Sequence, residues 1–101
     1  MSELELQRGA DGECSLVVRG EIDLANAPRL RELLDEVIDG GASRVVVDCR
    51  ELEFLDSSGI GVLVAARKRL GPDGTIVLSS PPAHVRKVLD ITGVTGQISV
   101  V

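Results

Sequence analysis

The chain begins with the alternation of apolar and polar side chains that is typical of half-buried β-strands. Leucines alternate with acidic and amide residues over residues 3–7, and an apolar run follows at residues 14–19. An Asp-Gly pair at residues 11–12 separates them, and this dipeptide favours a tight hairpin turn. The pattern therefore predicts an opening β-hairpin whose second strand is closed by Gly20 and Asp23.

A helical period replaces the alternation after Asn26. Apolar residues from Leu30 to Ile38 recur at intervals of three and four, and charged residues occupy the opposite face. Asn26 is the predicted N-cap, and Pro28 is compatible with a first turn, where amide groups have no helical partner. Two glycines at residues 40–41 end the helix, which is predicted to cover one face of a sheet.

The middle of the chain combines a strand-like run with a second helical pattern. Residues 44–49 form a continuous β-branched run, which is typical of a central strand covered by helices on both faces. Apolar residues then recur at helical spacing from residue 60 to residue 70, and three basic residues occupy positions 67–69. Cations favour the C-terminal end of a helix dipole, so this basic cluster has a structural explanation besides a binding role.

The last third of the chain predicts a strand, a helix and a strand. The strands lie at residues 75–78 and 97–101, and Val85, Val88 and Leu89 form the apolar stripe of the helix between them. The predicted order is β-β-α-β-α-β-α-β. This order indicates an α/β fold with a single-layer mixed, mainly parallel sheet and right-handed crossovers.

Length and composition indicate one domain over residues 1–101. The apolar fraction is 44%, and no run approaches the roughly 18 apolar residues of a membrane span. The N-terminal residues carry acidic side chains and lack the basic leader and apolar block of a signal peptide. We therefore expect no membrane segment and a cytoplasmic location.

The charge balance and the cysteines exclude further classes. The net charge is −5, and one Phe with no Tyr or Trp provides no stacking platform, so direct nucleic-acid binding and anionic-membrane binding are disfavoured. Cys14 and Cys49 lie in apolar runs, and with one His they cannot form a four-ligand zinc site. They are predicted to be buried, reduced thiols.

The best candidate site is the junction at residues 56–61, Asp-Ser-Ser-Gly-Ile-Gly. Asp and Ser side chains before a helix accept hydrogen bonds from the unpaired first-turn amides, so they can be caps and nothing more. The local pattern leaves capping and function equally open.

Catalytic alternatives have weak support. Ser57, Ser58 and His84 lack the Gly-x-Ser-x-Gly pattern of a hydrolase elbow, and no phosphate-binding Gly-rich motif is present. Asp23 and Asp56 are the only suggestive metal pair, and both have structural explanations as a strand-end and a helix-start residue. These observations favour modification or docking over catalysis, so we predict no enzyme, cofactor or bound metal.

Two motifs together resemble the STAS-domain family, and within it the bacterial anti-sigma factor antagonists. They are Gly-Glu-Ile-Asp at residues 20–23 and Phe-Leu-Asp-Ser-Ser-Gly-Ile-Gly at residues 54–61, and the element order extends the resemblance over nearly the whole chain. The resemblance implies that Ser57 is phosphorylated by a partner that is both anti-sigma factor and serine kinase. The unmodified form would bind this partner and free a sigma factor, phosphorylation would cause release, and a serine phosphatase would reverse it.

The resemblance also assigns the partner-binding residues. Asp23 is expected near the phosphoacceptor, with Asp56 beside it; Glu21, Ser58 and Gly59 complete the set, and Ser58 is also a possible cap. The two glycines of the second motif would allow close approach by the partner.

Three expectations stay open. Such proteins usually continue into a further C-terminal helix, so this chain, which ends at Val101, is a minimal variant or a truncated one. An edge exposed there would promote self-association, which leaves the oligomeric state as a monomer or a weak dimer. Other functions are a STAS interaction module in a stress-signalling or transporter-associated complex and, less favoured, a small hydrolase or a phosphocarrier that uses His84.

Overall fold

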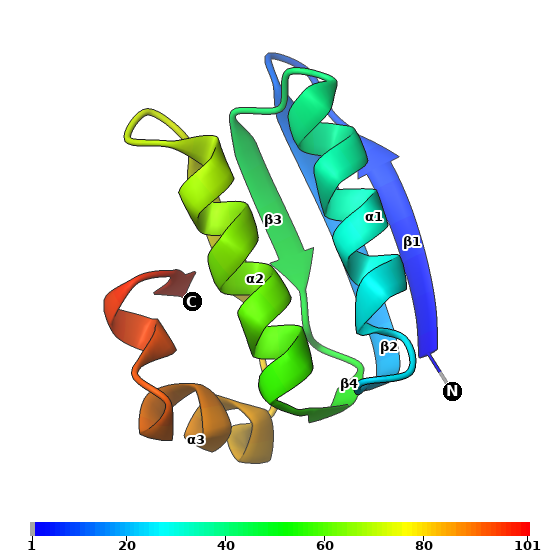
Figure 1. Ribbon diagram of the computed structural model, residues 1–101, viewed down its shortest axis with the longest axis vertical. Helices are drawn as coiled ribbons and strands as arrows, with labels where there is room; N and C mark the ends of the chain where they lie inside the picture. The colour runs from blue at the N-terminus through cyan, green and yellow to red at the C-terminus, as the bar shows by residue number, and fades with distance from the viewer. Residues whose placement is uncertain (1) are drawn as a thin grey trace.

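The protein folds into one twisted sheet with two long helices against it (Figure 1). The computed structural model describes residues 2–101. The elements in chain order are β1 (Ser2–Arg8), β2 (Glu13–Ile22), α1 (Ala27–Asp39), β3 (Arg44–Asp48), β4 (Leu52–Leu55), α2 (Ser57–Leu70), β5 (Thr75–Ser79), α3 (Ala83–Ile91), the short 3-10 helix η1 (Val94–Gly96) and β6 (Ser99–Val100). The strand order is β1-β2-β3-β5-β6, and β4 pairs with β2. Only β1 is antiparallel to its neighbour, so the mixed, mainly parallel sheet is confirmed.

The predicted hairpin is present, with Arg8 opposite Cys14 at its turn. Asp11 and Gly12 both have positive φ, at 57° and 78°. This is the backbone that a hairpin turn matched to the strand twist requires, and Asp and Gly tolerate it better than other residues. The turn chemistry thus sets the register of β1 against β2.

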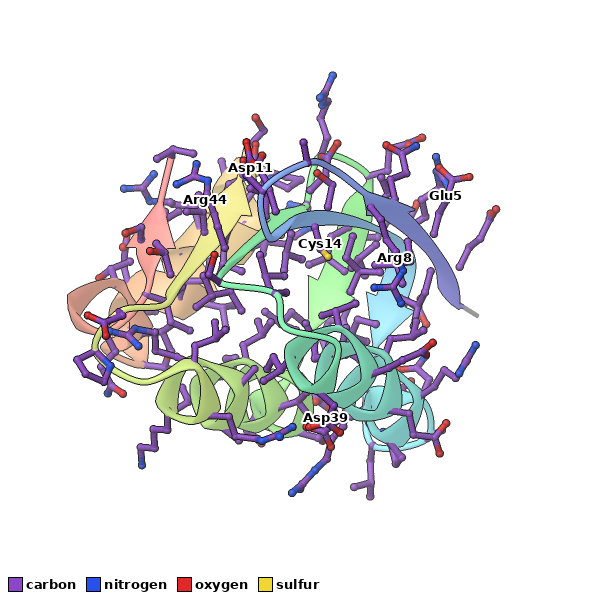
Figure 2. All side chains as sticks on the ribbon, turned by 90° about the horizontal axis from the view of Figure 1, so that it is seen from above. Glu5, Arg8, Asp11, Cys14, Asp39 and Arg44 are labelled. Atoms are coloured by element: carbon purple, nitrogen blue, oxygen red, sulfur yellow. The ribbon has the colours of Figure 1, made fainter. Side chains whose placement is uncertain are left out.

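The prediction that helices cover both faces of the central strand is wrong. Figure 2 shows α1 and α2 on the same side of the sheet, with Cys14 between sheet and helices. Val45 and Val47 of β3 are buried under the helices, whereas Val46 faces the open side and is half-buried. On that side Val77 of β5 is still only 6% exposed. Side chains on the open face are thus still largely shielded from solvent, so a β-branched run is compatible with a sheet that has one open face.

The core is aliphatic and lies between the inner face of the sheet and the helices. Its largest fully buried side chains are Leu16, Ile22, Leu30, Leu34, Ile76, Leu78, Leu89 and Ile98. Cys14 and Cys49 are free and buried there, as predicted. Burial, with a smaller contribution from the charge of Asp48, raises the pKa of the Cys49 thiol to about 12, so it stays protonated at neutral pH.

Two elements differ from the predicted order. Residues 52–55 form the short strand β4, which was not predicted, and a register shift between Gly20 and Glu21 lets it pair with the end of β2. The last strand is only Ser99–Val100, because η1 and the buried Ile98 occupy the chain before it. The additional strand β4 matters for function, because it leads directly to the motif at residue 56.

Candidate functional site

The two sequence motifs meet at one edge of the sheet. The carboxyl ends of β2 and β4 lie side by side with Ile22 paired to Leu55, and the amide of Asp56 donates to the carbonyl of Ile22 at 3.2 Å. Asp23 follows Ile22 directly, so both aspartates stand at this edge. Asp23, which the family resemblance places near the phosphoacceptor, therefore lies at the same edge as Asp56, and its role in partner binding stays a prediction.

Asp56 is the N-cap of α2. Its backbone is extended, and its carboxylate accepts from the amides of Ser58 at 2.9 Å and Gly59 at 3.3 Å. The hydrogen bond from the Ser58 hydroxyl has the largest effect on the pKa of Asp56 and lowers it; burial opposes this, and the amides of Gly59, Ser58 and Leu24 add to the lowering, so that the pKa lies below its ordinary value of 3.8. Asp56 is therefore ionised at neutral pH, and the cap is Asp56 rather than Ser58.

Ser57 is the first residue of α2 and is exposed, whereas Ser58 is half-buried. A helix start normally favours an anion, because its first amides lack partners. Here Asp56 already occupies the amides of Ser58 and Gly59. A phosphate on Ser57 would therefore stand beside an ionised carboxylate instead of replacing it.

The two glycines of the motif have different surroundings. Gly59 is buried, and a Cβ there would lie 2.5 Å from Leu55 Cδ1 and 2.6 Å from Ile22 Cγ2. The absence of a side chain at Gly59 lets the start of α2 pack closely against the ends of β2 and β4. The close approach is therefore between elements of this chain. A role of Gly59 in partner binding stays a prediction. Gly61 is exposed, and no atom lies within 4 Å of the position that a Cβ would take there, so it leaves open space one helical turn from Ser57.

Asn26 occupies the N-cap position of α1, but the prediction that its side chain caps the helix is wrong. Pro28 has no amide hydrogen, and the amide of Arg29 donates to the backbone carbonyl of Asn26. The Asn26 side chain turns back instead: its oxygen accepts from the amide of Asp23, and its nitrogen donates to the carbonyl of Glu21, both at 2.8 Å. Asn26 thus ties the loop to the end of β2.

Sequence reasoning missed two exposed apolar residues at this edge. Leu24, between Asp23 and the start of α1, is 78% exposed, and Phe54 of β4 is 50% exposed. Phe54 is paired with Glu21 in the sheet. A leucine directly after a strand-ending aspartate was the available signal for Leu24, whereas an apolar run around Phe54 reads as core.

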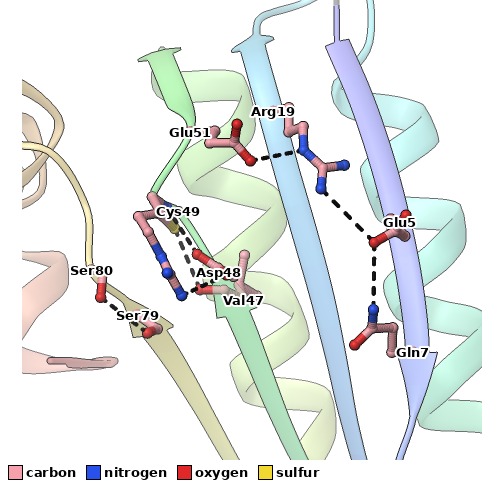
Figure 3. A network of polar contacts seen from close by, with 10 residues as sticks. Glu5, Gln7, Arg19, Val47, Asp48, Cys49, Glu51, Ser79 and Ser80 are labelled. Atoms are coloured by element: carbon pink, nitrogen blue, oxygen red, sulfur yellow. Dashed lines mark hydrogen bonds and ion pairs between the residues drawn. The ribbon is translucent and has the colours of Figure 1, made fainter.

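A separate group of charged residues lies on the open face of the sheet. Figure 3 shows Arg19 between Glu51 and Glu5, at 2.9 Å and 3.9 Å, and Arg19 also reaches Glu3 at 3.6 Å. His84, at the start of α3, lies 2.6 Å from the carbonyl of Glu53. Arg19 therefore already has carboxylate partners, and the contact of His84 links the start of α3 to β4.

Arg67 and Arg69, two of the three basic residues at the end of α2, have structural partners. Arg69 bridges to Asp35 and Asp39 of α1 at 2.8 Å and 2.6 Å, and Arg67 donates to the carbonyl of Gly71 at 2.9 Å. Their predicted place in the last turn of a helix is confirmed. Over residues 2–101 no three His, Cys, Asp or Glu side chains gather in a way that could hold a metal ion.

Comparison with known proteins decides the family. The family described as "Mlab, STAS domain" matches residues 6–101. The chain belongs to the STAS-domain family. None of the helices described in this STAS domain is long and apolar enough to cross a membrane.

The relatives of this STAS domain include anti-sigma factor antagonists. A putative anti-sigma factor antagonist, BtrV of Bordetella bronchiseptica, is 34% identical over 82% of this chain and 72% of its own length. The anti-sigma-B factor antagonist of Listeria monocytogenes is 30% identical over 96% of this chain and 86% of its own. The crystal structure of an anti-sigma factor antagonist from Mycobacterium paratuberculosis superposes with a TM-score of 0.90 at 25% identity, covering 99% of this chain and 85% of that one. Anti-sigma factor antagonists are regulators rather than enzymes, and by their names these relatives act on anti-sigma factors.

Proposed function

We propose that this STAS domain is a phosphorylation-controlled antagonist of an anti-sigma factor. Unmodified, it binds an anti-sigma factor that is also a serine kinase, and a sigma factor is freed. Phosphorylation of Ser57 causes release, and a serine phosphatase restores the binding form. The observation that carries the proposal is the exposed Ser57 on the first turn of α2, held by the Asp56 cap at the edge where Asp23 also lies.

The cap makes Ser57 a rigid substrate. Asp56 fixes the first turn through two backbone amides, and Gly59 lets that turn rest on Ile22 and Leu55. A kinase therefore meets the hydroxyl in one position and does not have to order the loop. We place the reaction in the cytoplasm, where a kinase has ATP.

The effect of the phosphate is electrostatic. Phosphorylation adds a charge of about −1.5 to −2 beside the ionised Asp56. The basic residues of α2 lie in its last turn, at the opposite end of the helix from Ser57. A partner surface that fits a neutral hydroxyl would meet this charge without a compensating cation. We expect an affinity loss of about 10- to 1000-fold without refolding of the domain.

The test is phosphorylation by the anti-sigma factor kinase encoded in the same genome, followed by mass-spectrometric site mapping. We expect phosphate on Ser57, none on the Ser57→Ala variant, and weaker kinase binding by Ser57→Asp with an unchanged circular dichroism spectrum. Ser58→Ala is the matched control, because Ser58 is the neighbouring, half-buried serine and we expect it to be phosphorylated normally on Ser57.

Persistent labelling of the Ser57→Ala variant would contradict the site. Stable binding to a transporter or a scaffold protein, without phosphorylation by any kinase of this class, would instead favour the alternative of a STAS module in another complex.

A further inference from the structure

The loop between β2 and α1 places a large apolar side chain in solvent next to the proposed phosphorylation site. Leu24 is 78% exposed, more than Ile91, Val101 or Phe54, the other large apolar residues that are exposed within residues 2–101. Ile22, two residues before Leu24, pairs with Leu55, and its carbonyl accepts from the amide of Asp56, the residue directly before Ser57. A single exposed leucine is ordinary on a protein surface, so exposure alone does not define a binding site.

The loop around Leu24 is fixed by several hydrogen bonds. The Asp23 carboxylate accepts from the amide of Ala25 at 2.9 Å, and the Asn26 side chain bonds to Asp23 and Glu21. The Asp23 carbonyl accepts from two further amides, those of Asn26 and Ala27. The polar groups of the loop are thus used to hold a conformation in which the apolar side chain points to solvent.

Such a residue is a good binding anchor for a physical reason. Ordering of loops and side chains at an interface opposes association, and a side chain presented on a preorganised backbone avoids most of that cost. Apolar side chains that enter a partner pocket near the centre of an interface provide much of the affinity. Phe54, half-exposed on β4 two residues before Asp56, adds apolar surface at the same edge.

The charges around these two residues define the partner surface. Glu21 and Asp23, at the end of β2, and Asp56, directly after β4, place three carboxylates at this edge, on a chain whose net charge is −5. A complementary surface therefore has an apolar pocket with lysine or arginine residues at its rim. An apolar centre with a charged rim is the usual anatomy of a specific protein interface.

We propose that Leu24 is the main apolar anchor by which this STAS domain docks on its anti-sigma factor, in an apolar pocket with a basic rim, and that Phe54 extends the contact. This inference rests on the proposed function and assigns part of the same surface. Leu24 contributes affinity in both phosphorylation states, whereas Ser57 determines whether the total is sufficient for a complex. The two contributions differ in kind, because one is apolar and the other is electrostatic.

The experiment is isothermal titration calorimetry of the full chain and its variants against the purified anti-sigma factor kinase encoded in the same genome, without ATP. We expect Leu24→Ala to lower the affinity about 10- to 100-fold and Leu24→Met, which keeps the apolar volume, to retain most of it. Ile91→Ala is the matched control, because Ile91 is 75% exposed on α3 and we expect no change. Raising the salt concentration is expected to reduce the penalty of Ser57→Asp but not that of Leu24→Ala.

The outcomes separate this inference from the proposed function. If Leu24→Ala binds as tightly as the parent chain while Ser57→Asp binds more weakly, the assignment of Leu24 as the anchor is wrong and the proposed function stands. An equal loss for Ile91→Ala also overturns the anchor, because the effect is then not specific to this edge. If the parent chain does not bind the anti-sigma factor, both are overturned. Thermal melting of each variant checks that the fold is retained, which the exposure of Leu24 leads us to expect.

Discussion

The first turns of α1 and α2 stand at the same edge of the sheet but are built in opposite ways. At α2 the residue before the helix, Asp56, caps two amides and presents the exposed Ser57. At α1 the corresponding residue, Asn26, leaves the helix amides to the backbone and bonds back to the loop, which leaves Leu24 exposed. Asp56 caps its helix and so presents the hydroxyl of Ser57, whereas Asn26 bonds back to its loop and so leaves the side chain of Leu24 exposed.

The largest change in stability is expected at Gly59, because its packing supports the start of α2 and not the start of α1. Gly59→Ala places a methyl group against Leu55 and the stiff side chain of Ile22, so we expect a loss of about 1–3 kcal/mol in the free energy of unfolding. Urea denaturation measures it. Gly61→Ala is the control of opposite sign: Gly61 is exposed and surrounded by open space in a helix, so we expect a gain of about 0.5–1 kcal/mol. Equal effects at both glycines would contradict the packing described for Gly59.

The α1 start is tested by Asn26→Ala, which removes both side-chain hydrogen bonds to the loop. We expect a loss of about 1–2 kcal/mol in the free energy of unfolding and faster amide hydrogen exchange at Asp23, whose amide loses its acceptor. Asn26→Asp is the informative control, since it keeps an acceptor for that amide but loses the donor to Glu21. Unchanged exchange at Asp23 in the alanine variant would show that the loop is held by its backbone alone.

The smallest expected effect is the pH dependence of the α2 cap. The folded pKa of Asp56 lies below its ordinary value of 3.8, so its contribution is complete above that value and is lost as the pH falls through the folded pKa. Asp56→Ala removes the cap, and we expect a melting temperature lower by about 5 °C at neutral pH. The difference between parent and variant is expected to shrink on acidification below pH 3.8. A difference independent of pH would mean that the cap does not depend on the charge.

Much of the fold follows from local patterns. The hairpin was predictable because Asp11 and Gly12 tolerate positive φ, and α1 because its apolar residues keep a helical period from Leu30 to Ile38. The strand β4 was not predictable, since four residues are too few to establish a period. Its pairing with β2 also depends on a register shift between Gly20 and Glu21. A valine run similarly does not distinguish a sheet covered on both faces from one covered on a single face.

The site was predictable only at the level of which residues meet. Parallel strands end at a common edge, so Asp23 and Asp56 could be expected together. It could not be predicted that Asp56, and not Ser58, caps α2, because either side chain can cap a helix. The backbone angles at residue 56 determine which of the two is the N-cap. The exposure of Leu24 was also inaccessible, since it results from how Asn26 bonds back to the end of β2.

The position of Phe54 has a spectroscopic consequence. It is the only Phe, Tyr or Trp in the 101 residues, and it is half-exposed at the edge that carries Ser57. The chain therefore contributes no tryptophan or tyrosine fluorescence, so an emission change on mixing with a partner reports on the partner alone. In a proton NMR spectrum, the ring of Phe54 and the imidazole of His84 are the only aromatic side-chain rings. Phe54 is thus the single benzene ring of the chain, and it lies three residues before Ser57, the proposed site of phosphorylation, whose modification its resonances would report.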